Sequence, residues 1–235
     1  MGDITIYGKH AVLLACKKRN QNDITTVFIV EKQSLDLIPK TLHGKVKITT
    51  VTALNKVSPM HNGFVCITSA VKEIHEHELL SMKKIIALDG VHDVGNIGAI
   101  LRSAVAFGVD AVIYTKDKMP DIANNPAIAK LSSGGIELIK LCKVVNLDRT
   151  LSNLQKEGFW VIGTDANGES ITHISQQFQS SKSIVVFGNE ENGIKPSIRK
   201  TCDVFAAINI NTQIGSLNVS AAAAIIMWKM FGKDK

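Results

Sequence analysis

The stretch LDGVHDVGNIGAILRSA, residues Leu88–Ala104, decides the fold class of this chain. An apolar run rich in branched side chains leads into a polar loop that carries glycine, and a stretch with helical periodicity follows. A strand, a loop and a helix in this order are typical of α/β proteins. Asn96 stands where the N-cap of the helix is expected. Arg102 is the only charged residue between Asp93 and Asp110, so it either lies along the helix surface or directs its guanidinium into a site.

The same alternation continues after this stretch and predicts a parallel sheet flanked by helices. Short apolar runs predict strands at 85–88, 111–114, 160–164, 184–187 and 204–208. Helical periodicity predicts helices at 97–107, 126–131, 147–156 and 197–200, and a final alanine-rich helix at 217–231. The final helix carries few charges, which favours its burial against a large surface such as a second subunit.

The first part of the chain predicts a smaller α/β unit. A helix is expected to start within 7–16, strands at 26–30, 46–51 and 64–68, and a further helix at 34–42. The charged segment KEIHEHE, at 72–78, is typical of a linker or an exposed helix. We therefore expect a small α/β domain at residues 1–72, a linker at 73–83 and a larger α/β domain at 84–235.

Composition limits the classes of function. Hydrophobic residues make up 45% of the chain, which is enough for a folded core. No run of about eighteen apolar residues is present, so no membrane span is predicted, and no signal peptide is recognisable. The four cysteines lack CxxC spacing and are expected to be buried, reduced thiols. The net charge of +6 is compatible with a polyanionic partner.

Two further segments bring polar residues and glycine to the ends of predicted strands. VVFGNEENG, at 185–193, runs into a Gly-x-Glu-x-x-Gly turn, and ININTQIGSLNVS, at 208–220, runs through a polar loop into a helix. The first is compatible with an ordinary turn, and Ser216 and Asn218 in the second are compatible with simple helix caps. Both segments nevertheless follow the carboxyl ends of presumed parallel strands, where α/β sheets bind ligands.

Several familiar sites are not supported by the sequence. No strand is followed by GxGxxG, by a Walker loop or by the glycine-rich loop of a Rossmann methyltransferase. The absence of a Gly-x-Ser-x-Gly elbow argues against a serine hydrolase. His75 and His77 have neither HExxH spacing nor partner cysteines, so a solvated segment is the better interpretation and no metal site is expected.

Taken together, the three segments resemble the SpoU/TrmH family of knotted methyltransferases over residues 84–231. Three family patterns, Asn-x-Gly-x-x-x-Arg, Gly-[Ser/Asn]-Glu-x-x-Gly and Ser-Leu-Asn-Val-Ser, occur in the right order and spacing, which makes the resemblance specific. The matching residues are Asn96, Gly98 and Arg102 for the first pattern, Gly188, Asn189, Glu190 and Gly193 for the second, and 216–220 for the third.

The first domain carries a resemblance of its own. YGKHAV, at 7–12, and HNGFV, at 61–65, look like the Gly-x-x-Ala-Val and His-Gln-Gly motifs of a small α/β RNA-binding domain. That domain precedes the catalytic one in ribosomal-RNA members of the family, such as the enzyme that methylates a guanosine ribose in bacterial 23S rRNA. Short tRNA-specific relatives generally lack it.

The resemblance implies a fold, a reaction and partners. The fold is a SPOUT catalytic domain, a parallel sheet with a deep trefoil knot, which is an exception to unthreaded topology. The reaction is methyl transfer from S-adenosylmethionine to a ribose 2′-hydroxyl of RNA, a guanosine in 23S rRNA. A tRNA ribose methyltransferase and a non-catalytic RNA-binding member remain alternatives. A cytoplasmic homodimer is implied, with its active site near the subunit interface, without a membrane or a metal.

The resemblance also implies the site residues. The resemblance gives Arg102 the role of a base, whereas the constant protonation of guanidinium in proteins favours binding of a phosphate and stabilisation of a developing alkoxide. The sequence leaves both roles open. The expected catalytic residues are Asn96, Arg102, Glu190, Ser216 and Asn218. The expected cofactor-binding residues are Thr164, Phe187, Gly188, Asn189, Gly193, Ile208, Ile210, Ser216 and Leu217.

One segment departs from the family pattern. Related enzymes usually have Ile-Pro-Met and a glycine soon after, where this chain has Ile208, Asn209 and Ile210, followed by Thr212. Without the fixed φ of proline the loop is expected to be less rigid, which would affect cofactor affinity more than the type of reaction.

Overall fold

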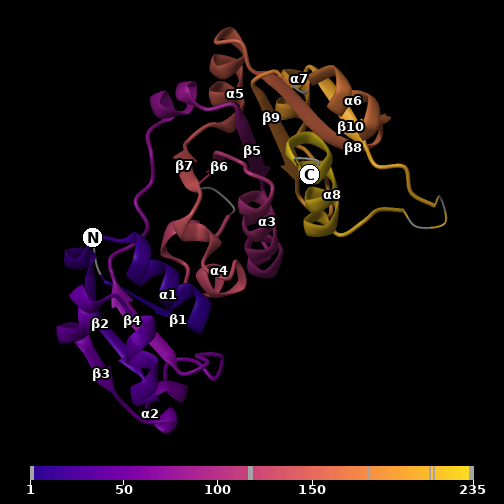
Figure 1. Cartoon of the computed structure of the whole chain (residues 1–235). Helices are drawn as coiled ribbons and strands as arrows, with labels where there is room; N and C mark the ends of the chain where they lie inside the picture. Colours follow the sequence, from indigo (N-terminus) through magenta and orange to yellow (C-terminus); the bar gives the residue numbers. More distant parts are fainter. Residues whose placement is uncertain (1–2, 116–118, 179, 212, 214, 233–235) are drawn as a thin grey trace. The chain divides into compact units, whose positions relative to one another are not determined.

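The protein was analysed as a computed structural model, which describes residues 3–115, 119–178, 180–211, 213 and 215–232. Its internal contacts divide the chain into two units. The first consists of Met1–Lys72 with Asp121–Leu138, and the second of Glu73–Pro120 with Ile139–Lys235. The elements of each unit are labelled in Figure 1.

The first unit is built on a four-stranded sheet in the order β1-β4-β2-β3. β4 pairs antiparallel with β1 and with β2, while β3 is parallel to β2. α1 packs against β1, β4 and α4. The strands are β1 (Ile4–Tyr7), β2 (Ile24–Ile29), β3 (Val46–Ile48) and β4 (Phe64–Thr68), and the helices are α1 (Lys9–Lys18), α2 (Val51–Asn55) and α4 (Pro126–Leu131).

A buried ion pair attaches the segment Asp121–Leu138 to the N-terminal residues of this unit. The Arg19 guanidinium donates from Nε and Nη2 to the two carboxylate oxygens of Glu137, over 2.9 and 2.5 Å. Its Nη1 donates to the Thr68 hydroxyl over 3.0 Å and also to the Ser69 carbonyl. The two charged side chains are only 7% and 4% exposed. A bidentate pair of this kind is strong and directional.

The helix predicted at 34–42 is wrong. The structure has 3₁₀ turns at Lys32–Leu37 and Lys40–Lys45 instead. Pro39 lies between the two turns, where it lacks an N–H to donate and disfavours the helical conformation of Ile38 before it. The backbone of Ile38 is accordingly extended, with φ −98° and ψ 136°.

The second unit is built on a six-stranded parallel sheet in the order β10-β8-β9-β5-β6-β7. This agrees with the predicted α/β class and parallel sheet. The strands are β5 (Lys84–Asp89), β6 (Ala111–Thr115), β7 (Lys140–Val144), β8 (Trp160–Ser170), β9 (Ser183–Gly188) and β10 (Val204–Ala207). The helices are α3 (Val94–Ala106), α5 (Leu147–Lys156), α6 (Ile171–Phe178), α7 (Pro196–Thr201) and α8 (Val219–Phe231).

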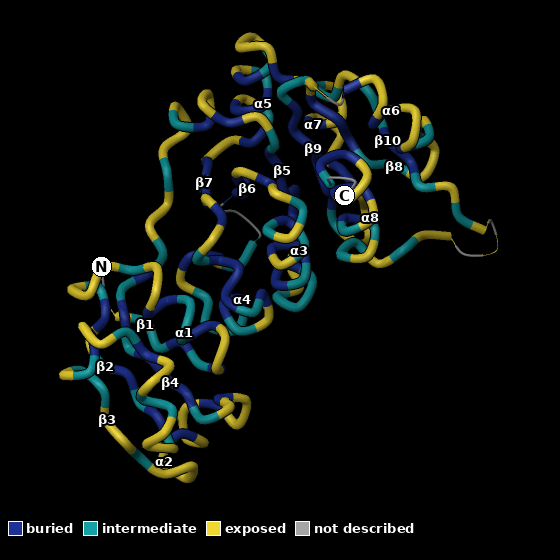
Figure 2. Tube along the Cα trace, in the orientation of Figure 1, coloured by how far each residue is buried: buried dark blue, intermediate teal, exposed yellow. Residues whose placement is uncertain are grey.

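Both faces of this sheet are covered, as Figure 2 shows by the dark blue of its central strands. Every residue of the run Ile85–Leu88 is fully buried, which is why the strand consists of a continuous apolar run without alternation. Leucines of α5 pack with Ile85 and Ala87 in one core. α3 packs against α8, and α8 against α6.

Most helices and strands lie where hydrophobic periodicity predicts them. α4 and α5 begin and end where predicted, and strands β5, β6, β9 and β10 are confirmed to within one residue at either end. β1, α2, β7 and α6 are not predicted by the pattern, because they are short and, in β7, because two lysines interrupt the apolar residues at a sheet edge. The strand predicted at 46–51 is too long: β3 ends at Ile48, and the Thr50 side chain caps α2, which begins at Val51. Cys16, Cys66 and Cys142 are buried free thiols, and Cys202 is half-buried.

Glu137→Ala should lower the free energy of unfolding of the first unit by about 3 kcal/mol, because it leaves the Arg19 charge buried without its partner. Denaturant titration followed by a probe in the first unit measures this change. Glu31→Ala, at an exposed position of the same unit, is the matched control and should change it by less than about 0.5 kcal/mol. Equal effects of the two variants would contradict the expectation.

Candidate functional site

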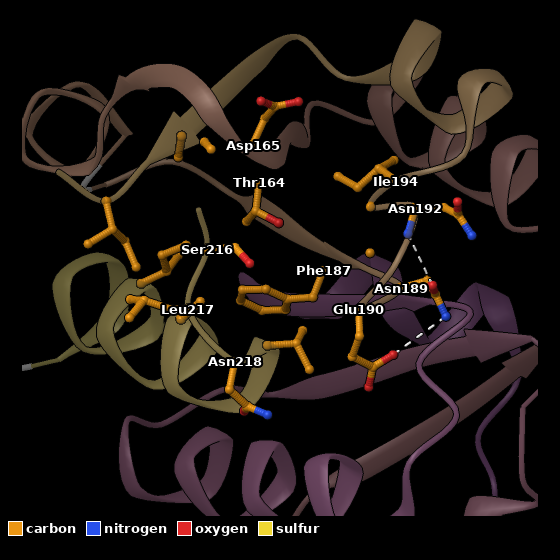
Figure 3. A pocket seen from close by; sticks show the side chains of 18 of the residues that line it. Thr164, Asp165, Phe187, Asn189, Glu190, Asn192, Ile194, Ser216, Leu217 and Asn218 are labelled. Carbon is orange, nitrogen blue, oxygen red and sulfur yellow. Dashed lines mark hydrogen bonds between the residues drawn. The ribbon is translucent and has the colours of Figure 1, made fainter. Parts of the chain in front are cut away.

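A pocket of about 490 Å³ opens at the carboxyl ends of strands β8, β9 and β10. Its walls are Thr164–Ala166 of β8, just beyond the residues of this strand that pair with β9, the loop that follows β9, and the segment that leads into α8. Figure 3 shows Phe187 in the middle of the pocket, with its ring between Leu217 and Glu190. Such a crevice at the carboxyl ends of parallel strands is where α/β sheets bind ligands.

The loop after β9 is a tight turn that only glycine permits. Asn189 and Gly193 exchange two backbone hydrogen bonds, of 3.0 and 2.9 Å. A Cβ atom on Gly188 would lie 2.2 Å from the carbonyl carbon of Gly193, so no other residue fits there. Gly193 itself has a φ of +64°, a conformation that glycine adopts without strain. The predicted Gly-x-Glu-x-x-Gly turn thus forms one wall of the pocket.

The Asn189 side chain organises this loop from inside. Its Oδ1 accepts hydrogen bonds from the backbone N–H groups of Glu191 and Asn192, at 2.9 and 3.2 Å. Its Nδ2 donates to the carbonyl of Gly90, over 2.8 Å. The loop after β9 is therefore joined to the loop after the neighbouring strand β5. Glu190 lies between Asn189 and Glu191, which both take part in these hydrogen bonds.

Asn96 does not cap its helix, contrary to the prediction from sequence. Asp93 is the N-cap of α3, and its carboxylate accepts the backbone N–H of Asn96 over 2.7 Å. The Asn96 side chain is therefore free to bond elsewhere. Its Nδ2 donates to Oε1 of Glu190 over 2.9 Å, and its Oδ1 accepts from Nδ2 of Asn218 over 3.0 Å. One amide thus joins all three sequence segments.

This network can have only one polarity. A carboxylate accepts hydrogen bonds and cannot donate, so Glu190 requires the NH₂ end of Asn96. The oxygen of Asn96 must then face the NH₂ group of Asn218, whose own oxygen points back to its helix. There it accepts the backbone N–H of Ser220 over 2.9 Å and the Ser220 hydroxyl over 2.6 Å. Asn218 is the N-cap of α8, as the sequence allowed, and also part of the site.

The pocket brings together most of the predicted site residues. All nine of the expected cofactor-binding residues line it, and so do Glu190, Ser216 and Asn218 among the expected catalytic ones. Asn96 is joined to both by hydrogen bonds. Arg102 stands apart, because it is exposed on α3 and is not among the lining residues. Of the departing segment, Ile208 and Ile210 line the pocket, whereas Thr212 is outside the described residues.

Several lining residues were not predicted from the sequence, among them the oppositely charged Asp165 and Arg199. Arg199 forms an ion pair with Asp165, and its guanidinium lies 4.3 Å from the centre of the Phe205 ring. The backbone N–H of Asn167, together with Arg199, holds the pKa of the Asp165 carboxyl below its usual range, so the group stays ionised at neutral pH. The place of Asp165 directly after the predicted strand 160–164 was a usable signal.

Other site classes find no support within the described ranges. No group of three or more histidine, cysteine, aspartate or glutamate side chains there is arranged to hold a metal ion. His75 and His77 stack on each other with ring centres 5.7 Å apart. A membrane-crossing helix, long and apolar enough to span a bilayer, is also not found among the residues searched.

Known proteins resemble this chain over nearly its full length. It is 35% identical, over 240 aligned residues, to the 23S rRNA (guanosine-2′-O-)-methyltransferase RlmB of Coxiella burnetii, with 96% of this chain and 94% of that protein covered. It is 31% identical to a putative TrmH family tRNA/rRNA methyltransferase of Staphylococcus epidermidis, with 99% and 97% covered.

The fold is also found in solved structures. The SpoU methyltransferase AviRb from Streptomyces viridochromogenes, in complex with the cofactor AdoMet, superposes with a TM-score of 0.80 at 19% identity, covering 98% of this chain and 90% of that one. The SpoU rRNA Methylase family profile matches residues 83–228, which contain the pocket and all three of its segments. The chain therefore belongs to the SpoU rRNA methylase family.

Proposed function

We propose that this protein transfers a methyl group from S-adenosylmethionine to the ribose 2′-hydroxyl of a guanosine in 23S rRNA. The observation that carries the proposal is the hydrogen-bonded network in which Asn96 links Glu190 and Asn218 at the edge of the pocket. The name of the relative from Coxiella burnetii supports the reaction and the substrate.

The pocket fits the cofactor in size and in chemistry. Its volume of about 490 Å³ lies within the range of about 300–1,000 Å³ that is usual for small-molecule sites. Phe187, Ile208, Ile210 and Leu217 would cover the apolar parts of S-adenosylmethionine, and the glycine turn would let it approach the backbone of Gly188 closely. When bound, the cofactor supplies a methyl group that its positively charged sulfur has already activated.

The residues of the chain then have to position the ribose and take up its proton. Glu190 is exposed at the pocket, and the Asn96 amide holds one of its carboxylate oxygens, so Glu190 is our candidate to accept the hydroxyl proton. Ser216 and Asn218, at the start of α8, would orient the ribose. Arg102 would bind a neighbouring phosphate and stabilise the developing alkoxide, because its guanidinium keeps its charge.

We further propose that residues 1–72 bind RNA, joined by Asp121–Leu138, which packs in the same unit. Exposed lysines of this unit offer charges for phosphate groups. They are Lys9, Lys17, Lys18, Lys32, Lys40, Lys47, Lys56 and Lys72. The resemblance of 7–12 and 61–65 to RNA-binding motifs supports the same role. In this proposal the remainder of residues 84–235 forms the knotted methyltransferase domain, and 73–83 link the two.

A homodimer and a cytoplasmic location complete the proposal. Ala221, Ile225 and Trp228 follow one another at intervals of four and three residues on α8, and all three are exposed. Such an apolar face is typical of a protein interface, and a second copy would cover it. That copy would also bring residues near the exposed Arg102. A ribosomal-RNA substrate favours the cytoplasm.

A tRNA ribose is the second candidate substrate, because the relative from Staphylococcus epidermidis is named for tRNA and rRNA. Tritiated methyl transfer to purified 23S rRNA and to bulk tRNA, followed by nucleoside mass spectrometry, separates the two. We expect 2′-O-methylguanosine at one position of 23S rRNA. Failure to bind S-adenosylhomocysteine, together with no transfer to either RNA, would favour a non-catalytic RNA-binding protein.

Arg102→Ala should lower kcat by about 10²–10³-fold, because it removes a charge that stabilises the transition state. Since Arg102 does not line the pocket, the affinity for S-adenosylhomocysteine in calorimetry should stay within about twofold. Arg149→Ala, at an exposed position on α5, is the control and should leave kcat unchanged. Normal turnover of the Arg102 variant would remove this residue from the mechanism.

Asn96→Asp should reduce kcat by about 100-fold, which is the usual effect of a misplaced catalytic group. The new carboxylate oxygen would face Oε1 of Glu190, where an amide now donates over 2.9 Å, and like charges repel. Asn153→Asp, at an exposed position on α5, adds the same charge away from the site and should have no effect. Single-turnover rates of both variants decide, and equal rates would argue against the network.

Ile225→Asp should dissociate the dimer, because it would bury a charge in an apolar interface. Sedimentation equilibrium should show a dissociation constant raised at least about tenfold, or about 1.4 kcal/mol. Val145→Asp, at a position 91% exposed elsewhere in the same unit, serves as control. An unchanged dimer in the Ile225 variant, or a monomeric wild-type protein, would exclude this face as the interface.

A further inference from the structure

Asp89 is a buried carboxylate beside the pocket that does not line it. It is the last residue of β5 and pairs in parallel register with Gly188, the last residue of β9. Asp89 as a whole is 1% exposed, and its side chain is fully buried. A buried charge is costly unless it is paired, so its presence at this strand end calls for a role.

Lys195 is the partner that offsets this charge. Its backbone N–H donates to Oδ2 of Asp89 over 2.8 Å, and its ammonium group lies 2.9 Å from Oδ1. Oδ1 has no well-oriented hydrogen bond to any part of the chain that the structure describes, so the ion pair is its main compensation. Lys195 directly precedes α7 and ends the loop that starts at Asn189.

The next residue, Gly90, holds the other end of the same loop. Its carbonyl accepts the hydrogen bond from Nδ2 of Asn189, over 2.8 Å. Two consecutive residues at the end of β5 thus hold both stems of the loop 189–195. Between the stems, the loop closes on itself through Asn189 and Gly193 and presents Glu190 to Asn96.

We propose that Asp89 is a positioning residue for the reaction. Through Lys195 it holds the second stem of the loop, so that Glu190 stays opposite Asn96 and the glycine turn keeps its place in the pocket wall. The effect on turnover rests on the proposed function, whereas the effects on loop order and on cofactor affinity do not.

The two-donor arrangement makes asparagine a poor substitute for Asp89. Lys195 offers one donor to each carboxylate oxygen, and an amide has only one oxygen to accept. In Asp89→Asn a donor would therefore face a donor, and the stem would have to move. Lys195→Met removes the ammonium but keeps the backbone N–H, so its effect should have the same direction and be smaller.

The first test measures loop order and cofactor affinity in the full-length protein. In Asp89→Asn the amide hydrogens of Asn189 and Gly193 should exchange at least about tenfold faster, because the loop opens more often. Calorimetry with S-adenosylhomocysteine should show a dissociation constant raised at least about tenfold, or 1.4 kcal/mol. Lys200→Met, which removes an exposed charge from α7, is the control and should leave both quantities unchanged.

The second test separates positioning from general stability. Asp89→Asn should lower kcat by about 10–100-fold while the KM for RNA stays within about twofold. Lys195→Arg keeps a cation at the carboxylate, so this variant should retain most of the wild-type kcat, unlike Lys195→Met. The double variant Asp89→Asn with Lys195→Met should lose less than the sum of the single losses in free energy, because the two residues act as a pair.

The outcomes are distinct. A lower melting temperature with normal kcat, normal amide exchange and normal cofactor affinity would mean that Asp89 only stabilises the fold, and the proposal would be overturned. If the wild-type protein transfers no methyl group to RNA, the proposed function fails. Faster loop exchange and weaker cofactor binding in Asp89→Asn would then still support the role of Asp89 in holding the loop.

Discussion

The pairing of β5 with β9 is the constraint on which the whole site depends. These two central strands run in parallel register from Lys84 opposite Ser183 to Asp89 opposite Gly188. Because both strands end at the same level, the loops that follow them emerge side by side, although about a hundred residues separate them in the sequence. The contacts of Gly90 with Asn189, of Asp89 with Lys195 and of Asn96 with Glu190 all cross this one junction.

The chemistry at the junction follows from the direction of its hydrogen bonds. A carboxylate can only accept, so Glu190 sets the orientation of Asn96, which in turn sets that of Asn218. The start of helix α8 is therefore linked to the loop after β9. Its N-cap, Asn218, donates a hydrogen bond to Asn96, which in turn donates one to Glu190. Asp89, which is buried beside these residues, adds a negative charge that Lys195, at the end of the loop, offsets.

The two units use buried charge in comparable ways. In the first unit, the pair of Arg19 and Glu137 attaches the segment Asp121–Leu138. In the sequence this segment comes after β5 and β6, the first two strands of the second unit. In the second, Asp89 and Lys195 attach a loop that carries Glu190. In both cases an ion pair joins segments that are far apart in the sequence, and its direction and strength fix where they meet. Both side chains of the first pair are nearly buried, whereas in the second Asp89 is buried and Lys195 is 47% exposed, so water screens the second pair more than the first.

The sequence by itself determined the α/β class, most strands of the parallel sheet, the three segments that meet at the site and about half of the residues that line the pocket. It could do so because strands buried on both faces need continuous apolar runs, and because glycine and amide residues mark turns and caps. It assigned Asn96 to a cap that Asp93 provides, and it predicted a helix across Pro39. It gave no sign of the partners of Arg19 or of Asp89, nor of the Asp165–Arg199 pair. Those partners were decided only by tertiary structure, because a hydrogen bond or an ion pair between distant segments depends on sheet register and on which groups remain unsatisfied after local structure has formed.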